Sequence, residues 1–148
     1  MVMKCSGCRN GESLGFDIRT AFQPIVDLTT GRPYAFEALV RGTNGESAGE
    51  ILGRVTEDSR YAFDQACRVN AIREAVAAGL LDTEAKLSIN FMPNAVYSPL
   101  ACIKLTMETA LETGLPTNRL IFEFTENERL DTDHVRSIVR AYQALGFT

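Results

Sequence analysis

Residues 120–125 read Leu-Ile-Phe-Glu-Phe-Thr, an apolar segment that carries one carboxylate. Two earlier segments have the same form: residues 34–40 read Tyr-Ala-Phe-Glu-Ala-Leu-Val, and residues 87–92 read Leu-Ser-Ile-Asn-Phe-Met. Each segment predicts a β-strand. Side chains alternate between the two faces of a strand, so the acid or amide of each segment lies opposite an apolar face.

The polar side chains of these three strands are Glu37, Asn90 and Glu123. Burying such groups without partners is costly, so they are expected to meet a partner. Two carboxylates and an amide oxygen that converge from neighbouring strands make a site for a hard divalent cation. The alternatives are a salt bridge from each glutamate to a neighbouring arginine, and a hydrogen-bonded core amide for Asn90.

A hairpin is expected to open the fold. Ala21 to Leu28 and Tyr34 to Val40 have strand character, and the short turn between them favours antiparallel pairing. Strands and helices then alternate, which implies parallel strands and an α/β fold. The sequence predicts helices over Glu50–Thr56, Ala62–Ala78, Ser98–Thr113 and Asp131–Leu145.

Two of these helices carry more detailed signals. The buried stripe of the helix over Ala62–Ala78 is expected to consist of Ala66, Val69, Ile72 and Val76. The last helix has Asp131 or Thr132 as a candidate N-cap, and Gly146 lies where a helix commonly ends. We interpret residues 147–148 as the entry into a further strand.

Composition and charge exclude several classes of protein. The 148 residues are 45% hydrophobic and 23% charged, as in ordinary globular proteins. The net charge of −4 argues against nonspecific binding to a nucleic-acid polymer, which normally needs a basic face. No run approaches the ~20 apolar residues of a membrane span, and no signal-peptide core is present, so we expect a cytoplasmic protein.

The four cysteines do not suggest a disulfide framework. Cys67 and Cys102 lie in predicted helices, where buried free cysteine is common. Cys5 and Cys8 have the spacing of half a zinc site or of a redox pair, but no second ligand pair accompanies them. A flexible N-terminal extension is the alternative interpretation of that segment.

Four motifs, in order, resemble those of the EAL domain, a family of bacterial cyclic di-GMP phosphodiesterases. They are Phe22-Gln-Pro-Ile-Val-Asp27, Glu37-Ala-Leu-Val-Arg41, Ser88-Ile-Asn-Phe91 and Glu123-Phe-Thr-Glu126. The resemblance covers residues 20–148 and leaves residues 1–19 as an N-terminal extension with the CxxC motif. It implies an incomplete TIM-type (β/α) barrel, with an initial antiparallel hairpin followed by parallel strand–helix units. A closed barrel of this type needs about 250 residues, so we expect the N-terminal half of a domain, truncated before an Asp-Asp motif.

The resemblance also assigns roles to residues. Glu37, Asn90 and Glu123 look like catalytic ligands of Mg²⁺ or Mn²⁺. Two such ions activate water and stabilise charge on the attacked phosphate. His134, the single histidine, is expected to be solvated rather than to act as a ligand or base.

Further residues resemble the contacts to the nucleotide. Gln23, Leu39 and Arg41 look like substrate-binding residues, with Arg41 able to hold a phosphate by paired hydrogen bonds. From the residues alone, Gln23 could face solvent, Leu39 could be plain core, and Arg41 could pair with Glu37 or Glu126. Glu126 resembles a residue that steadies an active-site loop, and it could equally cap the following turn.

The function implied for the intact domain is hydrolysis of cyclic di-GMP to linear pGpG, by a protein that forms a homodimer. The 148-residue chain alone is expected to be inactive, because it lacks the paired aspartates and the water-activating lysine of the family. The alternative is a non-catalytic module that binds cyclic di-GMP or a protein partner. A third hypothesis is that the chain acts by itself through dimerisation or domain exchange.

Overall fold

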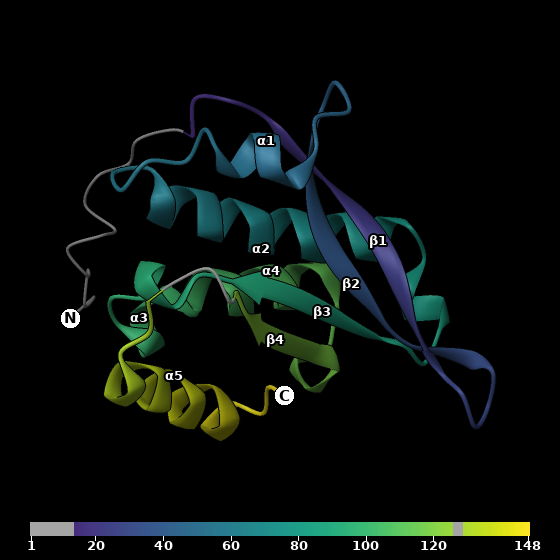
Figure 1. The fold of residues 1–148 in the computed structure, drawn as a ribbon. Helices are drawn as coiled ribbons and strands as arrows, with labels where there is room; N and C mark the ends of the chain where they lie inside the picture. The colour runs from purple at the N-terminus through teal and green to yellow at the C-terminus, as the bar shows by residue number, and fades with distance from the viewer. Residues whose placement is uncertain (1–13, 126–128) are drawn as a thin grey trace.

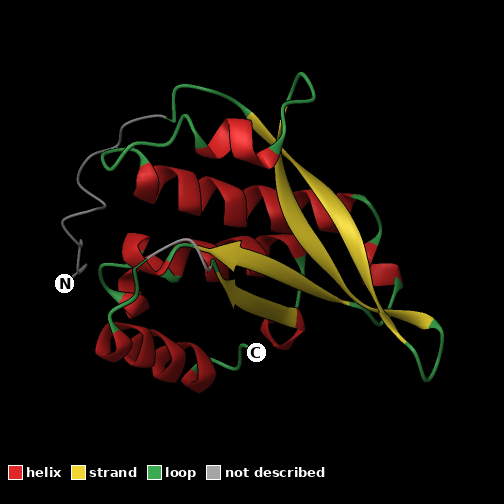
Figure 2. Ribbon diagram, in the orientation of Figure 1, coloured by secondary structure: helices red, strands yellow, loops and turns green. Residues whose placement is uncertain are grey.

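The computed structural model describes residues 14–125 and 129–148, and their fold is built on one four-stranded sheet (Figures 1 and 2). The order of the strands in the sheet follows the order in the chain. The strands are β1 (Ile18–Asp27), β2 (Arg32–Gly42), β3 (Lys86–Phe91) and β4 (Leu120–Phe124). β1 pairs with β2 antiparallel, whereas β2–β3 and β3–β4 are parallel. The expected hairpin followed by parallel strands is confirmed.

Five α-helices connect or follow the described strands. They are α1 (Ala48–Leu52), α2 (Arg60–Ala77), α3 (Pro99–Cys102), α4 (Lys104–Thr113) and α5 (Thr132–Ala144). Three short 3-10 turns complete the connections, namely η2 (Leu80–Asp82), η3 (Pro93–Ala95) and η4 (Thr117–Arg119). Within the described ranges, no helix is both long and apolar enough to cross a membrane.

Two expected helices differ from the observed ones. The first spans Ala48–Leu52 instead of Glu50–Thr56 and ends at the C-cap Gly53. It begins earlier because Ser47 and Glu50 form a capping box: the Ser47 hydroxyl accepts from the Glu50 N–H, and the Glu50 carboxylate accepts from the Ser47 N–H. The expected single helix over Ser98–Thr113 is wrong, since it is divided at Ile103. The Ile103 N–H closes the first turn on the Pro99 carbonyl, and its side chain enters the core.

The core lies between one face of the sheet and the helices. Leu87, Ile89 and Phe91 of β3 are buried on that face, as the alternation along the strand predicts. The helices that cover it contribute Ile72 from α2, Ala110 from α4, and Ile138 and Tyr142 from α5. Burial of each large apolar side chain contributes about 1.5–3 kcal/mol to stability.

The buried stripe expected for α2 is displaced around the helix. Of its four expected members, Ile72 is fully buried, whereas Ala66, Val69 and Val76 are partly exposed. The buried residues of α2 are Phe63, Asp64, Gln65, Arg68, Ala71, Ile72 and Ala75. Hydrophobic periodicity does not predict the buried face of α2, because that face includes two charged residues, Asp64 and Arg68, which form an ion pair in the core.

The end of the chain lies beside β4 (Figure 1). Asp131 is the N-cap of α5, since its carboxylate accepts from the N–H groups of Asp133 and His134. After α5, the Thr148 N–H donates to the Leu120 carbonyl at 3.2 Å, and the Phe122 N–H donates to the Thr148 carbonyl at 2.9 Å. Two bonds that flank one residue are the pattern of parallel pairing, which agrees with the expected entry into a strand.

Cys67 and Cys102 are free thiols in helical segments, as expected, and Cys102 is buried. Burial raises the pKa of the Cys67 thiol far above its usual range, so this thiol is a poor nucleophile. The CxxC cysteines Cys5 and Cys8, and also Glu126, lie outside the described residues.

Candidate metal and nucleotide site

The sheet register brings Glu37, Asn90 and Glu123 onto one face of three consecutive strands. Glu37 is paired with Ser88 across β2 and β3, and Asn90 is paired with Glu123 across β3 and β4. Ser88 and Asn90 are two residues apart, so they share a face of β3. This face is opposite the one that carries Leu87, Ile89 and Phe91 into the core.

Hydrogen bonds connect these side chains diagonally across the strands. The Asn90 Nδ2 group donates to the Glu37 Oε1 atom at 2.9 Å. The Ser88 hydroxyl, which is fully buried, donates to the Glu123 Oε1 atom in a short hydrogen bond. These two bonds do not use the second carboxylate oxygen of either glutamate. They also do not use the amide oxygen of Asn90, which can still accept a hydrogen bond or bind a cation.

The two glutamates are held by neutral donors. Among the ion pairs of the described residues, none includes Glu37 or Glu123. The Arg41 guanidinium donates to the Val40 carbonyl at 2.7 Å, and it likewise makes no ion pair with a described residue. The alternative salt bridges from arginine to Glu37 or Glu123 are therefore not found in this part of the chain.

The expected nucleotide-binding residues lie next to Glu37, Asn90 and Glu123. Gln23 on β1 is paired directly with Glu37 in the antiparallel register, and directly opposite residues share a face. Leu39 and Arg41 follow Glu37 at intervals of two along β2, so they also share its face. Gln23 is exposed, and Leu39 and Arg41 are half-buried.

A cavity of about 160 Å³ opens where β2 and β3 separate. It is lined by Leu39, Asn90 and Phe63, together with other mainly apolar side chains from β1, β2, β3, α1 and α2. Thr125, which follows β4, also contributes to its wall. The cavity therefore adjoins the polar site at the carboxyl ends of the parallel strands, where ligands of α/β sheets commonly bind.

The side-chain oxygens of Glu37, Asn90 and Glu123 suit a magnesium or manganese ion. Two carboxylates and one amide oxygen are hard ligands, and Mg²⁺ and Mn²⁺ favour oxygen. The described residues contain no group of three or more His, Cys, Asp or Glu side chains placed to hold a metal. That finding is consistent with this site, since its third ligand would be an amide.

Sequence reasoning missed several residues that support the site. Alternation along β3 places Ser88 on the same face as Asn90, but its bond to Glu123 depends on the parallel register, which no local pattern reports. Asp64, to which the sequence analysis assigned no role, accepts a hydrogen bond from the Met92 N–H at 2.8 Å. His134, expected to be solvated, is half-exposed, and its Nε2 atom also lies 3.0 Å from the Pro93 carbonyl oxygen in the turn after β3.

The chain belongs to the EAL domain family, whose family model matches residues 13–148. The fold class is therefore confirmed as α/β with the arrangement of a TIM-type EAL barrel.

A standalone EAL protein from Vibrio cholerae O395, solved in its cyclic di-GMP-bound form, is 51% identical, with a TM-score of 0.85 over 91% of this chain and 56% of that chain. BlrP1 of Klebsiella pneumoniae, solved with manganese and cyclic di-GMP, is 28% identical with a TM-score of 0.78. This match covers 90% of this chain and 34% of BlrP1.

A curated relative is the blue light- and temperature-regulated antirepressor BluF of Escherichia coli K12. It is 26% identical over 129 residues, which are 86% of this chain and 32% of BluF. The chain thus spans about half the length of the Vibrio protein and about a third of BlrP1 and BluF.

Proposed function

We propose that this chain forms the N-terminal half of an EAL domain that hydrolyses cyclic di-GMP to linear pGpG. The further ligands of the site, including paired aspartates, would come from the second half of the domain. Residues before the matched region would form an extension. We further propose that the intact protein is cytoplasmic and dimeric.

One observation carries the proposal. Glu37, Asn90 and Glu123 occupy one face of three consecutive strands, and within the described residues the two carboxylates have neutral donors instead of cationic partners. Two partly exposed carboxylates that converge on one face of the sheet repel each other, so the arrangement favours a bound cation. Related EAL structures hold cyclic di-GMP together with manganese or calcium.

Each residue then has a distinct task. Glu37, Asn90 and Glu123 would hold Mg²⁺ or Mn²⁺, which when bound supplies an activated water and neutralises charge on the phosphate. Asn90 also orients Glu37 through its amide N–H. Arg41 would hold a non-bridging phosphate oxygen, which requires it to release the Val40 carbonyl, and a guanidinium can hold such a group in bidentate fashion.

Gln23 and Leu39 would contact the remainder of the nucleotide. Gln23 is exposed beside Glu37, and its amide can donate to and accept from a ligand. Leu39 lines the cavity at the separation of β2 and β3, where it offers an apolar surface. Glu126 would steady the loop after β4.

A second candidate function is binding of cyclic di-GMP or of a protein without hydrolysis. The similarity to BluF, which is described as an antirepressor, favours this candidate. The two functions share the same nucleotide site and differ in whether the bound dinucleotide is cleaved.

The test compares Glu123→Gln with the wild type in the complete protein. Glutamine keeps the size of the side chain but removes the charge that binds the cation. Because even residues that merely support metal ligands typically contribute 10–100-fold, we expect turnover of cyclic di-GMP to fall by more than about 100-fold. Glu112→Gln is the matched control, since Glu112 is an exposed glutamate on α4 and should leave turnover unchanged.

The outcomes separate the two functions. Unchanged turnover in Glu123→Gln at saturating Mg²⁺ would remove the metal-ligand assignment. A wild-type protein that binds cyclic di-GMP but releases no pGpG, with either metal added, would establish the binding-only function instead.

A further inference from the structure

A buried ion pair lies directly behind the site, on the opposite face of the sheet. Asp64 and Arg68 are one turn apart on α2, and the Arg68 Nε atom lies 2.9 Å from the Asp64 Oδ2 atom. Their side chains are 2% and 0% exposed. Removing two charges from water is costly, so a pair like this adds little net stability compared with apolar residues of similar size.

Each charged group holds one of the two residues that follow Asn90. The Asp64 Oδ1 atom accepts from the Met92 N–H at 2.8 Å. The Arg68 guanidinium lies 5.3 Å from the ring centre of Phe91. The strand segment that presents Asn90 to the site is therefore held from behind by α2.

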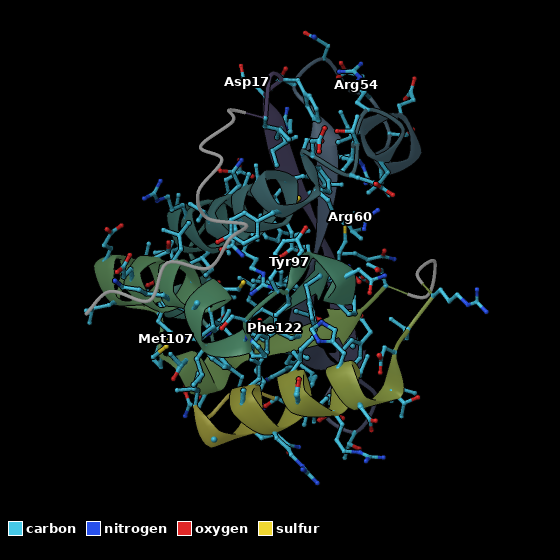
Figure 3. All side chains as sticks on the ribbon, turned by 90° about the vertical axis from the view of Figure 1, so that its left-hand side faces the viewer. Asp17, Arg54, Arg60, Tyr97, Met107 and Phe122 are labelled. Carbon is cyan, nitrogen blue, oxygen red and sulfur yellow. The ribbon has the colours of Figure 1, made fainter. Side chains whose placement is uncertain are left out.

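The far side of Arg68 reaches α5. Its Nη1 group donates to the Tyr142 hydroxyl at 2.9 Å, and the guanidinium also lies 5.3 Å from the ring centre of Phe122. Figure 3 labels Phe122, whose ring packs against Tyr142 at 5.0 Å between centroids. The pair thus lies among aromatic side chains of β3, β4 and α5.

The position of Met92 explains why an acceptor is needed there. The β2–β3 ladder ends at the pair Ala38–Ile89, before Asn90 is reached. The Phe91 carbonyl faces β4, since it accepts from the Thr125 N–H. Backbone groups of successive residues point to opposite edges of a strand, so the Met92 N–H points toward the β2 side, where no strand carbonyl continues the ladder.

We propose that Asp64 is a positioning residue for Asn90, a role that rests on the proposed function. Its carboxylate takes the place of the missing β2 carbonyl and fixes the end of β3, and Arg68 keeps that carboxylate in place. Without the acceptor, the N–H of the half-buried Met92 is a donor with no ladder partner, and the strand end shifts to regain one. The Asn90 amide then loses its alignment with Glu37 and with the cation.

The experiment replaces the ion pair in the complete protein by two neutral alternatives. Asp64→Leu with Arg68→Met removes both charges and the acceptor. Asp64→Asn with Arg68→Met removes both charges but retains an oxygen that can accept from the Met92 N–H. Mn²⁺ affinity is measured by calorimetric titration, and backbone amide exchange is measured for residues 90–92.

The acceptor should decide the result. We expect the Leu variant to bind Mn²⁺ about 10–100-fold more weakly, with faster exchange at Met92, and the Asn variant to stay within about threefold of the wild type. Mn²⁺ affinity in the Leu variant equal to that of the wild type would overturn the proposal. If the Leu variant does not fold, the Asn variant decides, since a tenfold loss with the acceptor retained would also overturn it.

Arg119→Met is the matched control for a general loss of strand anchoring. Arg119 holds the opposite end of β3, where its guanidinium donates to the carbonyls of Leu80, Thr83 and Ala85. This variant should lose stability without a change in Mn²⁺ affinity. Weakening equal to that of the Leu variant would make Asp64 an ordinary structural residue.

Glu123→Gln in the same titration separates this inference from the proposed function. If Glu123→Gln leaves Mn²⁺ affinity unchanged, the proposed metal site is wrong. If Glu123→Gln weakens binding and the Leu variant does not, the metal site stands and the positioning role of Asp64 is wrong.

Discussion

Charged side chains near the two faces of β3 have different kinds of partner. On the helix face, Asp64 and Arg68 are buried as an ion pair 2.9 Å apart, and the Arg68 guanidinium lies against the rings of Phe91 and Phe122. On the other face, Glu37 and Glu123 are partly exposed and accept hydrogen bonds from an amide and a hydroxyl. Neutralised charge behind the sheet holds the strand in place, whereas charge without a protein cation in front of it remains available to a ligand.

The largest expected contrast is in stability. Asp64→Ala leaves the buried Arg68 without its counterion, and breaking such a pair typically costs about 3–5 kcal/mol. Glu37→Gln removes a charge that has no cationic partner among the described residues, so its effect should stay within about 1 kcal/mol. Chemical denaturation of both variants in the complete protein measures the two free energies of unfolding. Similar losses in the two variants would show that the faces do not differ in this way.

A smaller effect is expected from Ser88→Ala. The substitution removes the donor that orients the Glu123 carboxylate and leaves the backbone of β3 unchanged. We expect turnover to fall by about tenfold, because residues that orient metal ligands commonly contribute 10–100-fold. Steady-state kinetics at varied Mn²⁺ concentration should show that weaker metal binding causes the loss of turnover. A variant with normal metal affinity and normal turnover would leave Ser88 with a packing role alone.

The smallest expected effect concerns Tyr142 and depends on pH. Burial raises the pKa of the Tyr142 phenol, and the nearby Arg68 charge opposes that shift. A raised pKa in the folded state gives stability below the unfolded value of about 10, and this stability is lost as the pH rises through the folded value. At neutral pH, Tyr142→Phe should cost about 1–2 kcal/mol through the lost hydrogen bond to Arg68.

The difference between wild type and Tyr142→Phe should therefore shrink above about pH 10. Unfolding measurements of both proteins from neutral to alkaline pH test this. A difference that stays constant or grows across that range would contradict the assigned shift.

The sequence predicted the open face better than the buried one. Alternation along β2, β3 and β4 was sufficient to place Glu37, Asn90 and Glu123 opposite apolar faces, since a strand has two faces. The buried face of α2 could not be predicted in the same way. Asp64 and Arg68 have the spacing of an ordinary surface ion pair, and their burial depends on the Met92 N–H and the Tyr142 hydroxyl, which lie far away in the sequence.

Local sequence patterns could not predict the contacts between distant residues either. The bond from Ser88 to Glu123 joins residues 35 positions apart, and it follows from a register set by the whole of β3 and β4. His134 meets the Pro93 carbonyl across 41 positions, which the first turn of a helix does not reveal. Local patterns identified the three polar side chains of the sheet face, and tertiary packing determined which side chains contact them.

The central claim is that Glu37, Asn90 and Glu123 form one cation site. The most direct test is anomalous diffraction from crystals of the complete protein soaked in Mn²⁺. We predict a manganese peak within coordination distance of a side-chain oxygen of each of the three residues. A fully occupied manganese peak elsewhere, with none between β2, β3 and β4, would contradict the account.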